Sequence, residues 1–191
     1  MLRKLRKHMG DKLDIFIYGS QLKYKILILG CEEEDFIKKL FKRFPNSNMD
    51  IMDKDFTNIL YISSIIGVNE NVNYIHGDIE FEELQDKYDL IFSNGNFHLI
   101  DDFQELLNKF YNGLNYSGKI IFSTIIESIY KNNINENFIA HKYLYPEEIK
   151  DCIEGRYRVL IIDEEIIREP NTFSADLIYM VLEKVYKKSY L

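Results

Sequence analysis

The sequence has few of the residues that build cross-linked or metal-bound folds. Its 191 residues include two cysteines, three prolines and no tryptophan. Cys31 and Cys152 lie far apart and lack both a second cysteine pair and the spacing of metal ligands, so we expect neither a disulfide framework nor a metal site. Both cysteines are interpreted as small, buried apolar groups.

Long apolar runs are also missing, which excludes a membrane-spanning helix. No run approaches the roughly 18–20 residues that such a helix needs. The basic start, Leu2–His8, is followed by Gly10, Asp11 and Lys12 rather than by the hydrophobic region of a signal peptide. We therefore expect a soluble, cytoplasmic protein with no membrane partner, and we interpret the basic cluster as a frayed, solvated terminus.

Positive charge is scarce relative to negative charge. The chain has 24 Lys and Arg against 31 Asp and Glu, a formal net charge of −7. Because nucleic-acid binding depends on clustered Lys and Arg, we expect no nucleic-acid partner. With 46% hydrophobic residues, the length suits one well-buried core. We predict an N-terminal segment at residues 1–23 and a single domain at residues 24–191.

Strand and helix patterns alternate along that domain. Nearly continuous apolar runs such as Tyr24–Leu29 are typical of parallel strands buried on both faces. The predicted strands are Tyr24–Leu29, Met49–Met52, Asn73–His76, Tyr88–Ser93, Lys119–Thr124, Tyr157–Ile162 and Leu177–Val185. The predicted helices are Phe36–Phe44, Phe56–Ile66, Phe103–Leu114 and Pro146–Ile153. This alternation predicts a three-layer α/β sandwich around a seven-stranded, mainly parallel sheet, with one antiparallel strand near its C-terminal end.

Four segments, read in order, carry a resemblance to a known family. They are ILILGC, IMDKD, YIHGDIEFEEL and the long segment from Tyr88 to Thr124. From about Tyr24 to its C-terminus the chain resembles the class I S-adenosylmethionine-dependent methyltransferases. Within them it is most similar to the malonyl-carrier-protein methyl ester synthases of biotin synthesis. The resemblance implies a Rossmann-like fold, S-adenosylmethionine as cofactor, and methyl transfer to a small molecule or a carrier-bound acid.

Carboxylates follow the second and third predicted strands. Asp53 lies roughly twenty residues after the first turn, where a carboxylate can accept hydrogen bonds from both ribose hydroxyls. An Asp before a helix is also often an N-cap, and Asp55 suits either role. The resemblance assigns Asp78 to the adenine amino group and the backbone N–H of Ile79 to a ring nitrogen. The alternative for Asp78 is a turn carboxylate.

Polar residues also follow the fourth predicted strand. Asn94 stands at the carboxyl edge of the sheet, where its amide can orient the methionine end of the cofactor. Phe97 and His98 are expected to line the methyl-transfer face, which makes His98 the candidate catalytic residue. A single loop histidine also suits an ordinary surface or packing role. Transfer to a carboxylate needs no base, because the nucleophile is already ionised and the enzyme supplies alignment.

The loop after the first strand contradicts the family pattern. Gly30 is kept, but Ile28 replaces the usual acid, and Glu32 and Glu34 occupy later glycine positions. A side chain at a position that needs positive φ costs about 1 kcal/mol. The acids of Glu32–Asp35 also satisfy the positive end of the following helix, which disfavours an anionic ligand group there.

Two functions therefore stay open from the sequence. One is an active methyltransferase with Gly30, Asp53, Asp78, Ile79 and Asn94 around its cofactor. The other is a catalytically inactive protein of the same fold that serves as a binding or scaffold subunit, either as a homodimer or with a protein partner. A nicotinamide-dependent oxidoreductase is disfavoured, since the glycine deficit harms a pyrophosphate even more than a carboxylate.

Overall fold

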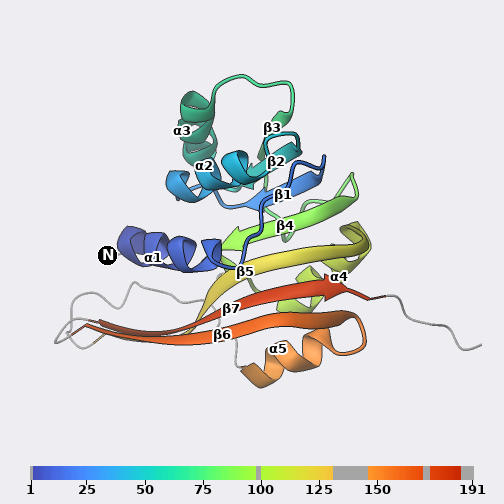
Figure 1. Ribbon diagram of the computed structural model, residues 1–191. Coiled ribbons are helices and arrows are strands. Elements are labelled where there is room, and N and C mark those ends of the chain that lie inside the picture. Colours follow the sequence, from blue (N-terminus) through green and yellow to red (C-terminus); the bar gives the residue numbers. More distant parts are fainter. Residues whose placement is uncertain (1, 98–99, 131–145, 170–172, 186–191) are drawn as a thin grey trace, which may run out of the picture.

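The structure, a computed structural model, describes residues 2–97, 100–130, 146–169 and 173–185 (Figure 1). One seven-stranded sheet has the strand order β3-β2-β1-β4-β5-β7-β6. The strands are β1 Lys25–Leu29, β2 Asn48–Asp53, β3 Val72–His76, β4 Tyr88–Asn94, β5 Leu114–Tyr130, β6 Tyr157–Glu169 and β7 Phe173–Lys184. The helices are α1 Leu2–Asp14, α2 Glu34–Arg43, α3 Phe56–Ile66, α4 Phe103–Gly113 and α5 Pro146–Ile153. Every predicted strand and helix is present.

The first five strands are parallel, as the buried apolar runs predict. β1 lies between β2 and β4, and Ile26–Leu29 are all buried. The chain leaves β1 toward β2 on one side and returns to β4 on the other. Open α/β sheets bind ligands at such a reversal point, beyond the carboxyl ends of the strands.

The C-terminal end of the sheet is antiparallel, which confirms the predicted fold class. β7 runs antiparallel to both β5 and β6. β5 is much longer than predicted, since it begins at Leu114 and pairs with β7 as far as Tyr130 and Phe173. The turn-like sequence near its start persists as an irregularity, with Ser117 at φ 57° and a shift of the β4–β5 register between Tyr88 and Leu90.

Helices cover both faces of the sheet and produce two apolar cores. One core joins α1, α2 and α3 to the first face, and the other joins α4 and α5 to the second. The three layers are visible in Figure 1. In the described part of the chain, no helix combines the length and apolar character that crossing a membrane requires.

The interpretation of the basic N-terminal cluster as a frayed terminus is wrong. Residues Leu2–Asp14 form α1, which buries Leu5, Met9 and Leu13 in the first core. Their four-residue spacing places these side chains on one face of the helix, so the basic residues project elsewhere. α1 therefore belongs to the packed structure and brings its polar face toward α2.

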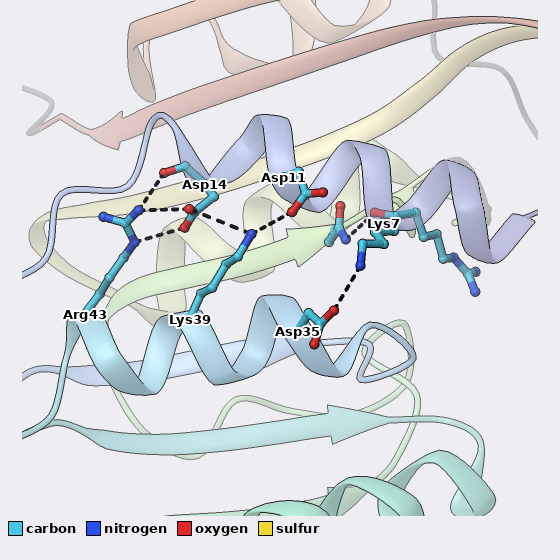
Figure 2. Close-up of polar contacts among 8 residues, drawn as sticks. Lys7, Asp11, Asp14, Asp35, Lys39 and Arg43 are labelled. Atoms are coloured by element: carbon cyan, nitrogen blue, oxygen red, sulfur yellow. Dashed lines mark hydrogen bonds and ion pairs between the residues drawn. The ribbon is translucent and has the colours of Figure 1, made fainter.

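Paired charges line the contact between α1 and α2 (Figure 2). The pairs are Lys7 Nζ–Asp35 Oδ2 at 3.2 Å, Lys39 Nζ–Asp11 Oδ1 at 2.6 Å, and Arg43 to Asp14 through two N···O contacts of 2.9 Å. Exposed pairs of this kind each contribute about 0–1 kcal/mol. We conclude that apolar burial, rather than these charge pairs, holds α1 in place.

Truncation of the buried face of α1 is expected to destabilise the whole domain. Leu13 is 0% exposed, so Leu13→Ala should lower the free energy of unfolding by about 3 kcal/mol, through lost burial and the cavity left behind. Leu22→Ala is the control, because Leu22 is 66% exposed and its truncation should change stability by less than about 0.5 kcal/mol. Urea denaturation measures both variants. Equal stabilities would show that α1 does not contribute to the core.

Candidate functional site

A cavity of about 220 Å³ opens at the carboxyl ends of the parallel strands. Gly30 contributes from the end of β1, Asp53 from β2, and Asp78 and Ile79 from the segment after β3. Four of the five predicted cofactor residues thus line one cavity at the expected edge of the sheet. Arg6, Glu32 and Asn96 line it as well, and neither Arg6 nor Asn96 was predicted from the sequence to belong to a site.

Asp53 organises the floor of this cavity. It is 8% exposed, and its Oδ2 accepts hydrogen bonds from Cys31 N at 2.8 Å and from Asn58 Nδ2 at 3.3 Å. Its Oδ1 accepts from Asp55 N at 2.8 Å. A carboxylate offers about four acceptor sites, so Oδ1 keeps capacity for a further donor. Asp55 takes the N-cap role of α3, accepting from Thr57 N at 2.8 Å, and it also lines the cavity.

The Cys31 thiol is an inert neighbour of Asp53. The side chain is fully buried, and its Sγ lies 3.4 Å from Asp53 Oδ2. Burial above all, and then the charge of Asp53, raises the pKa of the thiol well above its ordinary value. The thiol therefore stays protonated and donates to the carboxylate, which agrees with its interpretation as a buried structural group.

The segment after β3 is held firmly. Asp78 Oδ1 accepts from Glu80 N at 3.1 Å, so this carboxylate forms a turn and also lines the cavity. Lys109 of α4 donates to the carbonyl oxygens of Ile79, Glu80 and Glu82 at 2.7, 2.9 and 2.8 Å. Because one ammonium has three donors, it can fix three carbonyl groups at once. Lys109 was missed in the sequence, where nothing links it to a turn thirty residues earlier.

Gly30 meets a requirement that no other residue type satisfies without strain. Its φ is 78°, and a Cβ atom there would lie 2.0 Å from Asn96 Nδ2. That amide donates to Leu29 O at 3.1 Å, and Gly30 N donates to Met52 O at 2.8 Å. The expected backbone cost at Glu32 and Glu34 is wrong: among the described non-glycine residues, positive φ occurs at Ser117 alone.

The acidic run is largely engaged within the protein. Asp35 pairs with Lys7, while Glu34 accepts from Lys38 Nζ at 3.1 Å and from the Tyr61 hydroxyl. The Tyr61 hydrogen bond, followed by that of Lys38, lowers the pKa of Glu34, and Lys7 lowers that of Asp35. These two acids therefore remain ionised and face cations or donors.

Arg6 and Glu32 bring opposite charges to the cavity. They form an ion pair, and the Arg6 side chain is only 16% exposed. Burial lowers the pKa of Arg6, against the attraction of Asp53. A guanidinium remains charged in proteins despite such a shift. The apolar spacing of Leu5, Met9 and Leu13 was the signal that could have placed Arg6 in a packed helix.

The residues predicted after β4 are placed differently from one another. Asn94 does not line the cavity: its Nδ2 donates to Arg6 O at 3.0 Å, and its Oδ1 accepts from Ser123 Oγ at 2.9 Å. Phe97 is 1% exposed and packs in the second core, where its ring centroid lies 4.7 Å from that of Phe122. His98 lies outside the described residues.

Comparison with known proteins adds sequence relatives and structural neighbours. No family model matches the chain. It is 36% identical over 173 residues to malonyl-(acyl-carrier protein) O-methyltransferase 1 of Ilyobacter polytropus, which covers 87% of this chain and 65% of the relative. It is 34% identical over 184 residues to O-methyltransferase 2 of the same organism, covering 93% and 71%. The chain thus spans about two thirds of the length of these relatives.

A solved structure shows that the fold is shared more widely. The crystal structure of the N-methyltransferase NodS from Bradyrhizobium japonicum WM9 in complex with S-adenosyl-L-homocysteine matches with a TM-score of 0.68 at 11% identity. The match covers 96% of this chain and 87% of that chain. At this level of identity the likeness concerns architecture alone.

Substitution of Gly30 should show how tightly Asn96 closes the loop. Gly30→Ala and Gly155→Ala both place a side chain at positive φ, but a Cβ at Gly155 meets no atom within 4 Å. We expect a loss of unfolding free energy of about 1 kcal/mol for Gly155→Ala, and of about 1–3 kcal/mol more for Gly30→Ala. Denaturant titration measures both. Asn96→Ala in the Gly30→Ala background should recover most of the extra loss, and equal losses in the two single variants would contradict the overlap.

Proposed function

This chain belongs to the family of malonyl-(acyl-carrier protein) O-methyltransferases, and we propose that it transfers a methyl group from S-adenosylmethionine to a carrier-bound carboxylate. The observation that carries the proposal is the row of Asp78, Asp53 and Gly30 at the carboxyl ends of three neighbouring strands. The relatives' names supply the acceptor class, a malonyl group on an acyl-carrier protein.

The cavity residues fit an elongated adenosyl ligand. Neighbouring strands lie about 4.8 Å apart, so the order β3-β2-β1 places Asp78, Asp53 and Gly30 in sequence along one edge. An adenine beside Asp78 and Ile79 would leave the ribose at Asp53 and the methionine end at Gly30. The space that a Cβ of Gly30 would fill is occupied by the Asn96 amide, which lines the same cavity.

The chain's own residues have simple tasks in this reaction. The bound cofactor supplies a methyl group activated by its sulfonium. Asp53 and Asp78 accept hydrogen bonds from the nucleoside, and apolar side chains at Met52, Ile79 and Ile100 limit water in the cavity. The acceptor carboxylate is already ionised, so orientation rather than proton removal lowers the barrier. Within this proposal Asn94 acts indirectly, because its Nδ2 donates to Arg6 O and so holds α1 beside the cavity.

The alternative of an inactive binding or scaffold subunit is not favoured. Its main support was the acidic loop, and the pairing of Glu34 and Asp35 with cations and the Tyr61 hydroxyl supports a cavity that those acids do not fill. Both relatives are named as methyltransferases. The protein partner that fits the proposal is the acyl-carrier protein that delivers the acid.

Methyl transfer to malonyl-acyl-carrier protein tests the proposal directly. With labelled S-adenosylmethionine, we expect label on the malonyl carrier and none on the carrier without an acyl group. We also expect cofactor at 100 times its Kd to add about 2.7 kcal/mol to the free energy of unfolding. If a folded sample neither binds the cofactor in a calorimetric titration nor transfers label, the proposed function is wrong.

Removal of the Asp78 charge should weaken cofactor binding without unfolding the protein. Asp78→Asn loses a charged acceptor worth about 1.5–3 kcal/mol, which corresponds to a roughly 10–100-fold rise in Kd for S-adenosylhomocysteine. Glu70→Gln is the matched control, since Glu70 is exposed and does not line the cavity. Calorimetric titration gives both constants. A Kd for Asp78→Asn within twofold of the control would remove Asp78 from the site.

A further inference from the structure

Two opposite charges face the cavity from segments that lie far apart in the sequence. Arg6 belongs to α1, whereas Glu32 lies in the loop between β1 and α2. They form an ion pair at the cavity wall, with side-chain exposures of 16% and 40%. Family membership and the glycine pattern give neither residue a role.

The pair stands beside the part of the cavity that is farthest from Asp78. The sheet order β3-β2-β1-β4 places Gly30 and Asn96 on the opposite side of Asp53 from Asp78. Glu32 follows Gly30 by two residues, and Arg6 is bound through its carbonyl oxygen to Asn94 at the end of β4. A ligand whose nucleoside contacts Asp78 and Asp53 would therefore extend its other end toward Arg6 and Glu32.

The Arg6 side chain is held in advance of binding. Gly95, which has a φ of 73°, leaves space for the arginine, since a Cβ there would lie 3.5 Å from Arg6 Cγ, and the guanidinium is paired with Glu32. One residue further along α1, Lys7 is paired with Asp35 of α2 (Figure 2). A cation positioned this way loses little side-chain entropy when a ligand binds.

The positive charge of Arg6 can bind a ligand carboxylate that the N-terminus of α2 would bind weakly. The N-terminus of α2 carries Glu34 and Asp35 in its first turn, so the positive end of that helix is already matched by acids. A ligand carboxylate would gain little there. A guanidinium can instead bind a carboxylate through two parallel hydrogen bonds, and Glu32 offers an acceptor for an ammonium group.

We infer that Arg6 and Glu32 form the binding site for the amino-acid end of the cofactor, with Arg6 on its α-carboxylate and Glu32 on its α-ammonium. This inference rests on the proposed function, because it assigns the second half of the same ligand. Binding would exchange one ion pair within the protein for two pairs with the ligand, so neither charge is left buried without a partner. The site would then select adenosyl compounds that carry a zwitterionic end.

Two ligands that differ in that end provide the test. S-adenosylhomocysteine carries the amino-acid group, and 5′-methylthioadenosine lacks it. Calorimetric titration of Arg6→Met should show at least a tenfold rise in Kd for S-adenosylhomocysteine and less than a twofold change for 5′-methylthioadenosine. Lys7→Met is the matched control, since it removes the same charge from the same helix outside the cavity, and both constants should stay within twofold.

Glu32→Gln provides a second variant on an exposed loop, in case Arg6→Met unfolds α1. It should raise the Kd for S-adenosylhomocysteine at least threefold and leave 5′-methylthioadenosine unchanged. The inference is overturned if neither variant alters the preference between the two ligands, or if both ligands weaken equally in a folded variant. A parent protein that binds neither ligand defeats the proposed function itself, whereas a parent that binds both with unaltered variants defeats this inference alone.

Discussion

The geometry of the cavity depends on the Asp53 carboxylate. Its Oδ2 holds the backbone N–H of Cys31, and its Oδ1 holds that of Asp55, so one side chain joins the loop after β1 to the start of α3. A loop with a single glycine has little freedom to fold around a ligand. The hydrogen bonds of Asp53 fix the conformation of this loop, because a buried charge-assisted hydrogen bond is costly to break. The loop therefore keeps its course although Glu32 and Glu34 stand where the family pattern has glycines.

α1 packs beside this loop and brings cations to its acidic side chains. Its apolar face is buried through Met9 and Leu13, and Gly10 allows close approach to the end of β4, where a Cβ would lie 2.9 Å from Asn94 Nδ2. The polar side of the helix then carries Arg6 to the cavity and Lys7 to Asp35. The same helix thus supplies core packing and two cations beside an acidic run. Two of the four successive acids, Glu32 and Asp35, are thus paired with residues that precede the predicted domain.

Helices and strands that local sequence patterns determine were predicted well from the sequence. Those whose extent depends on contacts with distant segments were predicted less well. The continuous apolar run of β1 predicts a buried strand by itself. β5 extends to Tyr130 because it pairs with β7 up to Phe173, and no local sequence pattern reveals that pairing. α1 contains Gly10, which lowers its helix propensity, and tertiary burial of Met9 and Leu13 stabilises it. Asn94 and Asn96 differ by the turn at Gly95, with φ 73°, which sends one amide under α1 and the other into the cavity.

The acids that remain around the cavity have a consequence for the proposed reaction. Asp53, Asp55 and Asp78 face it together with Glu32, while Arg6 and Lys54 supply the opposing charge. A cofactor with a sulfonium is more positive by one charge than its demethylated product, so a negative wall attracts the cofactor more strongly. At about 4–6 Å and an effective dielectric of about 20, one such charge pair amounts to roughly 3–4 kcal/mol before screening. In the proposed reaction the carboxylates of Asp53, Asp55 and Asp78 would therefore favour binding of the methyl donor and release of the product.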